Sequence, residues 1–248
     1  MEKKAYDEKI YTEGISTEGG KFAKWFDNFW YHYKWPTIGI LFALVVFLVC
    51  TIQSCTKEEE DILILYAGRA GLPEDKSNGV CDVLEAVMPY DFDENGTKQA
   101  KFIHYEVLSE AQLKDKMAET DEAGSQKYTI SRSYFSSEYK SFYQSLQTGE
   151  QSVLLLDEWL YQELLNEDRL VPLDTVLKTV PETAVNGHGI RVGDTQWYWK
   201  YNAARALPED TVICLLHPYV AGKSSKPKMY QREKEMFAAL VEQPLLEP

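Results

Sequence analysis

The longest apolar stretch of the chain runs from Pro36 to Cys55 and contains no charged side chain. A helix of about twenty apolar residues is just long enough to cross the hydrocarbon core of a bilayer. Tryptophan, tyrosine and lysine, which favour the boundary between lipid and water, crowd its front edge at Lys24, Trp25, Trp30, Tyr31, Tyr33, Lys34 and Trp35. The pattern therefore predicts a single transmembrane helix over residues 36–55.

The segments on either side of this span are short. Residues 1–20 are polar and contain three glycines, which predicts a disordered cytoplasmic tail. Residues 21–35 carry aromatic side chains at spacings of three and four, which predicts a juxtamembrane helix. This helix either lies along the interface or continues into the span at Pro36. Residues 56–61 form a charged linker.

Residues 62–248 alternate between short apolar runs and amphipathic segments. Strands are expected at 62–66, 102–107, 152–156, 189–192, 196–201 and 211–216. Helices are expected at 80–88, 111–117, 133–146, after Asp157 and at 229–241. Strands that alternate with helices are typical of βαβ units. We therefore expect an extracytoplasmic α/β domain whose mostly parallel sheet is covered by helices.

Three large rings, Trp197, Trp199 and Tyr201, follow one another at a spacing of two. On an extended strand, this spacing places all three on one face. Three rings on one face either cover the sheet as part of the core or form an exposed patch that docks a protein partner.

The formal net charge of −13 belongs to the large domain, because six lysines cancel six acids within residues 1–56. A domain this acidic is not expected to bind nucleic acid through phosphate contacts. We place the N-terminus in the cytoplasm and the domain outside, since a long segment is translocated regardless of its charge.

Four cysteines do not make a disulfide-rich framework. Cys81 and Cys214 either form one bridge or are two separate small apolar residues. Cys55 follows a short sequence that loosely matches a lipoprotein cleavage site, but the long preceding tail favours an uncleaved signal anchor.

The stretch Gly149–Leu160, followed by Leu170–Asp174, is the most specific in the chain. It resembles the middle of extracellular solute-binding proteins of bacterial uptake systems, where a glycine turn, an apolar strand, an acid-started helix and an L-x-P-L-D segment occur in this order. The resemblance implies a single periplasmic-binding-protein-like lobe, because too few residues follow Asp174 for a second lobe.

The whole chain also resembles a group of uncharacterised single-pass membrane proteins of Gram-positive anaerobes. The resemblance rests on Phe29–Trp35, Leu65–Gly68 and Val192–Thr195. It implies a fold and a place in the cell envelope, and it implies no reaction.

Ligands of an open parallel sheet lie beyond the carboxyl ends of its strands. Five residues at two such ends are the candidate ligand-binding residues: Gly68, Arg69, Asp157, Glu158 and Trp159. Gly68 would let a ligand approach the backbone, Arg69 would pair with a carboxylate or phosphate, and Trp159 would stack on a ring. The alternative is a solvated arginine and a tryptophan packed under the rim of the sheet.

Asp91, Asp93 and Asn95 match the first half of a calcium loop. Phe102 occupies the twelfth position, where such loops carry a bidentate glutamate. We therefore expect no bound metal and interpret the segment as a turn with Asn95–Gly96 at its tip.

The chain contains no H-E-x-x-H, C-x-x-C, P-loop or G-x-S-x-G motif. We expect no enzyme and no cofactor. The sequence favours a membrane-anchored extracytoplasmic binding module with a solute-binding-like single lobe. The alternative is an accessory subunit that has lost its ligand and docks another cell-envelope protein.

Overall fold

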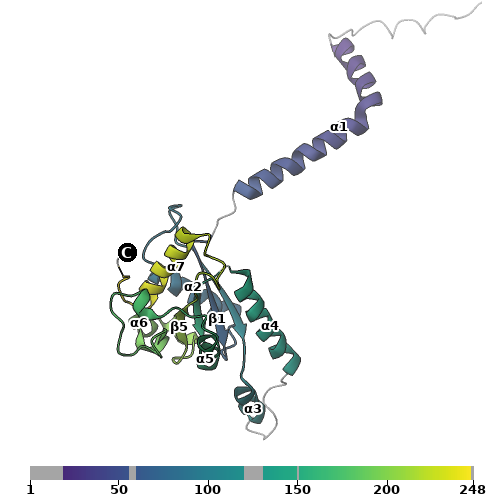
Figure 1. Ribbon diagram of the computed structural model, residues 1–248. Helices are drawn as coiled ribbons and strands as arrows, with labels where there is room; N and C mark the ends of the chain where they lie inside the picture. The colour runs from purple at the N-terminus through teal and green to yellow at the C-terminus, as the bar shows by residue number, and fades with distance from the viewer. Residues whose placement is uncertain (1–18, 56–59, 120–130, 150, 247–248) are drawn as a thin grey trace, which may run out of the picture. The chain divides into compact units, whose positions relative to one another are not determined.

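The computed structural model describes residues 19–55, 60–119, 131–149 and 151–246. The chain divides into two compact units, Met1–Glu59 and Glu60–Pro248. The first unit contains helix α1 (Gly19–Cys55), and the second contains the sheet and the remaining helices (Figure 1).

Helix α1 runs without interruption through Pro36. The aromatic segment and the apolar segment therefore form one continuous helix. Because proline has no N–H group, Pro36 cannot donate the helical hydrogen bond to the residue four positions earlier, and Figure 1 shows a bend in α1. Phe29–Ile52 is long and apolar enough to cross a membrane, with a mean hydropathy of 2.4.

The second unit is an α/β domain built on one five-stranded sheet in the order β2-β1-β3-β5-β4. Its strands are β1 (Ile62–Gly68), β2 (Ala100–Glu106), β3 (Val153–Leu156), β4 (Gly189–Arg191) and β5 (Val212–Leu215). Strand β1 pairs in parallel with β2 and β3, whereas β5 pairs antiparallel with β3 and β4. The sheet is therefore mixed: β1, β2, β3 and β4 run in the same direction, as predicted for a mostly parallel sheet, and β5 runs in the opposite direction between β3 and β4.

The physical reason lies in the connection between β4 and β5. A parallel neighbour requires a crossover that carries the chain back along the whole sheet. Here the chain turns at the edge where β4 ends, since Val192 N donates to Thr211 O at 2.8 Å and Gly193 N to Glu209 O at 3.0 Å. Strand β5 therefore starts beside the end of β4 and must run in the opposite direction.

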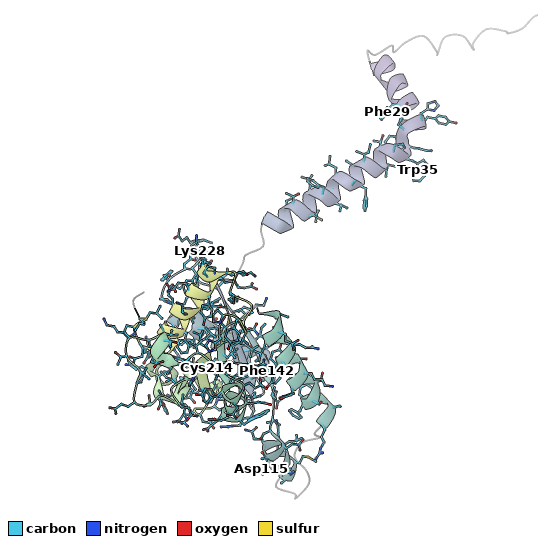
Figure 2. The ribbon with its side chains drawn as sticks, viewed as in Figure 1. Phe29, Trp35, Asp115, Phe142, Cys214 and Lys228 are labelled. Atoms are coloured by element: carbon cyan, nitrogen blue, oxygen red, sulfur yellow. The ribbon has the colours of Figure 1, made fainter. Side chains whose placement is uncertain are left out.

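Helices cover both faces of the sheet (Figure 1). On one face, α2 (Glu74–Val87) and α7 (Pro227–Leu240) pack on Ile64 and Tyr66. On the other face, α4 (Arg132–Thr148) and α5 (Glu158–Asn166) pack on Leu65 and Ala67. Successive residues of a strand point to opposite faces, so the unbroken apolar run of β1 is buried on both sides, as predicted. Figure 2 shows Phe142, from the second face, among the densely packed side chains.

The predicted strand at 196–201 is instead the short helix α6 (Gln196–Lys200). Residues two apart lie on nearly opposite sides of a helix, so the three rings do not share a face. Trp197 is buried and Trp199 is 51% exposed. The alternative of one partner surface made by Trp197, Trp199 and Tyr201 is therefore wrong, and the core alternative holds for Trp197 and Tyr201 but not for Trp199.

A distant residue caps this helix. The carboxylate of Glu242 accepts hydrogen bonds from Gln196 N at 3.0 Å and from Trp197 N at 3.2 Å. The first N–H groups of a helix have no partner inside it. A carboxylate from beyond α7 supplies that partner here, which local spacing cannot reveal.

Cys81 and Cys214 are both free thiols. Cys81 lies on α2, where its Sγ donates to Ala100 O at 2.7 Å, and Cys214 belongs to the core on the opposite face. Cys81 and Cys214 are therefore two separate residues and do not form a bridge. Burial raises the pKa of the Cys81 thiol to about 11.

Candidate functional site

The strand order creates a switch point at the carboxyl ends of β1 and β3. From β1 the chain moves through α2 to β2 on one side, and then returns through α4 to β3 on the other side. Helices α2 and α4 lie on opposite faces. Connections that diverge in this way leave a crevice at the carboxyl edge of the sheet, where open α/β sheets bind their ligands.

Asp157 stands at the centre of this edge. Its backbone N donates to Ala67 O at 2.9 Å, and its side chain caps α5 by accepting from Trp159 N at 3.5 Å. The sequence-based assignment of Asp157 to the start of a helix is confirmed. The residue is 5% exposed, so its carboxylate is largely sheltered from water.

Arg69 lies between two carboxylates. Its Nη1 is 3.2 Å from Asp157 Oδ2, and its Nη2 is 2.5 Å from Asp210 Oδ1. The hydrogen bond to Asp210 raises the pKa of Arg69. Asp210 was not among the predicted site residues. Only the antiparallel placement of β5 brings the turn before that strand to Arg69, and no local signal indicated this.

Gly68 serves the packing of Tyr66. A Cβ atom at Gly68 would lie 2.7 Å from the Tyr66 hydroxyl oxygen, which accepts a hydrogen bond from Ala70 N at 2.9 Å. The missing side chain thus makes room for a buried ring. Burial raises the pKa of Tyr66 well above its ordinary range.

A hollow of about 320 Å³ lies beside Arg69. Its lining consists of Arg69, Arg191, Gly193, Asp194, Glu209 and Asp210. Glu158 belongs to this region through Arg191, whose Nη2 lies 3.5 Å from Glu158 Oε1. The hollow is therefore lined by charges of both signs, and its two arginines are held in ion pairs that are partly open to water.

Trp159 faces away from this hollow. Its ring stacks on Tyr139 of α4, with centroids 6.2 Å apart and planes at 12°. It packs against the core on the α4 and α5 face, and its buried indole N–H has no hydrogen-bond partner among the described residues. Trp159 is therefore packed against the core, as the second alternative had it, and its ring does not lie beside Arg69.

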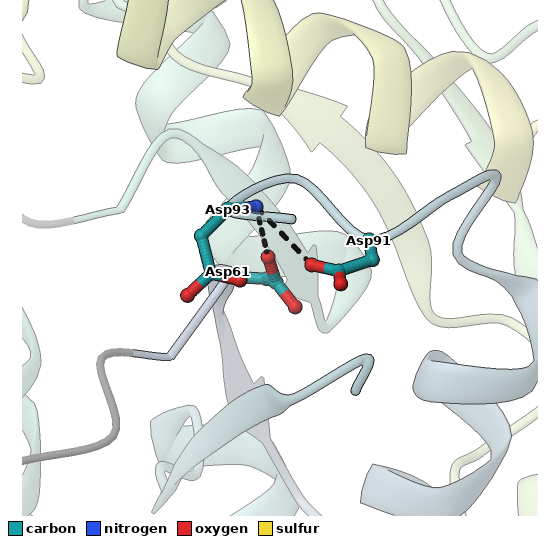
Figure 3. A group of neighbouring side chains, drawn as sticks. All are labelled: Asp61, Asp91 and Asp93. Atoms are coloured by element: carbon teal, nitrogen blue, oxygen red, sulfur yellow. Dashed lines mark hydrogen bonds between the residues drawn. The ribbon is translucent and has the colours of Figure 1, made fainter. Parts of the chain in front are cut away.

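A third carboxylate, that of Asp61, lies beside the segment that matches half of a calcium loop, and one oxygen each of Asp61, Asp91 and Asp93 lie within 4.8 Å of one another (Figure 3). Asp61 accepts from the N–H groups of Phe92, Asp93 and Gln99. Asp91 accepts from those of Asp93, Glu94 and Gly96.

These N–H donors occupy the carboxylate oxygens that a cation would use. Partial desolvation opposes ionisation of Asp91, but the N–H donors outweigh it and lower the pKa of Asp91. Asn95 Oδ1 likewise turns into the loop and accepts from Thr97 N at 2.8 Å. The segment is therefore a turn with Asn95–Gly96 at its tip, in which backbone N–H groups satisfy the side-chain oxygens.

A second charged group lies at the opposite, amino edge of the sheet. Ser152 Oγ donates to Glu233 Oε2 at 2.6 Å, and Lys223 Nζ lies 3.4 Å from Glu233 Oε1. Lys223 is 1% exposed and Glu233 is 2% exposed. Burial raises the pKa of Glu233, although Ser152 and Lys223 act in the opposite direction. The group is sealed, so it ties α7 to β3 and offers nothing to a ligand.

No family model matches the chain, and neither a curated protein nor a solved structure matches it. The candidate site therefore rests on the geometry of the carboxyl edge. The resemblance to solute-binding proteins contributes an expectation only.

Proposed function

We propose that the protein is a membrane-anchored binding module that holds a small polar ligand at the carboxyl edge of an extracytoplasmic α/β domain. One observation carries the proposal: Arg69 lies at the switch point between Asp157 and Asp210, beside an open hollow. This is where the topology of such a sheet favours ligand binding.

The chemistry of the hollow supports an anionic ligand group. The Arg69 side chain, which pairs with Asp210, is 40% exposed, and exposed ion pairs contribute little to stability. A carboxylate or phosphate can therefore replace Asp210 at low cost, because the arginine fork matches such groups in geometry. Carboxylates at the rim would accept hydrogen bonds from the rest of the ligand.

Binding is favoured over catalysis by the kinds of groups present. The described residues that line the hollow are arginines, carboxylates and a glycine. Arginine keeps its proton in proteins and does not serve as a general acid or base. These residues offer charge pairing and hydrogen bonding, and they offer no histidine, cysteine or serine nucleophile.

Thermal unfolding of the full-length protein in detergent tests this proposal. A panel of small carboxylates and phosphate esters should contain a compound that raises the melting temperature of the wild type. Arg69→Gln should abolish the shift, and Arg232→Gln, which changes another exposed arginine, should preserve it. A shift of equal size in Arg69→Gln would overturn the proposal.

The location of the domain has its own test. Phe29–Ile52 meets the length and composition of a membrane span. Protease added to intact cells should remove the domain and leave a membrane-bound fragment that ends near residue 60. Protection of the domain until the cells are lysed would reverse the orientation.

One observation favours a second candidate, an accessory subunit that docks another envelope protein. Trp199 is half exposed, and the Arg205 guanidinium lies 5.7 Å from its ring centroid. Tryptophan and arginine are enriched among the residues that dominate protein interfaces. Trp199→Ala should keep the melting temperature and lose a co-purifying partner. An unchanged set of partners would remove this candidate.

A further inference from the structure

Helix α3 (Glu110–Ala118) stands apart from the helices that cover the sheet (Figure 1). Figure 2 shows its Asp115 at the periphery of the domain, away from the labelled core residues. Leu113 is the one residue of α3 with a buried side chain. In α5, a helix of the same length, Leu160, Tyr161 and Leu164 are all fully buried. Apolar packing therefore holds α3 far less firmly than α5.

Two polar ties connect α3 to the carboxyl edge. Gln112 Nε2 donates to Asp157 at 3.1 Å and 3.2 Å, one bond to each carboxylate oxygen. Lys116 Nζ lies 2.5 Å from Oε1 of Glu106, the last residue of β2. Both ties end on carboxylates at the carboxyl ends of β3 and β2, the two strands that flank β1. The helix is thus attached to the switch point itself.

Helix α3 also carries its own N-terminal cap. Gln112 N donates to Ser109 Oγ at 3.2 Å, and Ser109 N donates to Gln112 Oε1 at 2.9 Å, which together form a capping box. Because the cap uses Oε1 and the tie uses Nε2, the tie to Asp157 can break while the cap remains. The helix can therefore leave the edge without unwinding.

We propose that α3 is a displaceable cover over the switch point, which opens as a unit and exposes the carboxylate of Asp157. Closed, its Gln112 amide occupies the carboxylate of Asp157, and this carboxylate becomes available beside the already exposed Arg69 when α3 opens. Its use in ligand entry rests on the proposed function, whereas the opening itself does not. A weakly packed segment of this kind is expected to open at a free energy below that of global unfolding.

Hydrogen exchange of the full-length protein in detergent, measured without ligand by mass spectrometry, tests the cover. Amides of α3 should exchange faster than those of α5 in the wild type. Gln112→Glu preserves the capping box, since a glutamate can also accept from the cap N–H, but it sets a carboxylate against Asp157. It should speed exchange in α3 by about tenfold or more, as expected from the loss of a hydrogen bond to a charged group.

Two further variants control the result. Lys114→Gln removes an exposed charge from the same helix and should leave exchange unchanged. In the Gln112→Glu background, Asp157→Asn restores a donor opposite the new carboxylate and should slow α3 exchange again.

Two outcomes would overturn the cover. One is that α3 exchanges as slowly as α5 and that Gln112→Glu does not change its rate. The other is that Gln112→Glu accelerates exchange equally in α3, α5 and β1, which would indicate global unfolding. Failure to find a ligand would count against the proposed function and would leave this result unaffected.

Discussion

The two edges of the sheet carry similar ionic chemistry in opposite surroundings. At the amino edge, Lys223 and Glu233 are almost completely buried, and Ser152 supplies a further hydrogen bond. At the carboxyl edge, Arg69 is 40% exposed and shares its guanidinium between two carboxylates beside a hollow. The same kinds of charged groups are thus sealed at one edge and open at the other.

This difference assigns different roles to the two groups. A buried ion cannot exchange its partner for a ligand, and removal of one partner leaves an uncompensated charge in a medium of low polarity. An exposed ion pair contributes little to stability and loses little when a ligand replaces one partner. The difference supports a structural role for the amino edge and is consistent with the ligand binding that we propose for the carboxyl edge.

The largest expected effect is at the amino edge. Glu233→Met should lower the free energy of unfolding by about 3–5 kcal/mol, because the buried Lys223 ammonium loses a carboxylate partner. The double variant Lys223→Met/Glu233→Met should recover most of this loss, since an apolar pair carries no unpaired charge. Urea unfolding of the full-length protein in detergent measures both. A loss below about 1 kcal/mol in the single variant would show that the pair is not sealed.

The pH dependence of the same pair gives a second test. Because burial raises the pKa of Glu233 above its ordinary value of 4.5, the folded state binds this proton more tightly than the unfolded state does. Its contribution to stability is therefore largest below pH 4.5 and is lost as the pH rises through the folded pKa. The stability advantage of the wild type over Glu233→Gln should grow as the pH falls from 8 toward 5. A constant difference would contradict a raised pKa.

An intermediate effect is expected for Asp157→Ala. It removes the cap of α5 and one of the two carboxylate partners of Arg69, which should cost about 1–2 kcal/mol of unfolding free energy. Asp157→Asn keeps a capping oxygen and should cost less. A loss as large as that of Glu233→Met would place Asp157 with the sealed, structural group.

The smallest effect is expected for Asp210→Asn. An exposed ion pair contributes at most about 1 kcal/mol, so urea unfolding should change little. The variant should bind an anionic ligand more tightly, because a carboxylate no longer competes for Arg69. Weaker binding in a calorimetric titration would show that Asp210 is part of the recognition and not a competitor for it.

Part of the site could be predicted from the sequence. Arg69 follows an apolar run that ends in glycine, and Asp157 begins an amphipathic segment, so both could be placed at strand ends from local pattern alone. Asp210 and Gln112 could not. Their contacts with Arg69 and Asp157 span 141 and 45 positions in the chain. Such contacts depend on how the strands are ordered, and no local pattern records that order.

The local sequence pattern determined those elements that can be recognised from their own residues alone. The charge-free run of α1, the doubly buried run of β1 and the capped start of α5 are examples, because periodicity and capping act over a few residues. Tertiary structure decided the rest. The direction of β5 follows from a chain that turns at one edge of the sheet, and the short helix α6 follows from a cap supplied by Glu242. Burial, which depends on every neighbour at once, decided that Lys223 and Glu233 are sealed while Arg69 remains open.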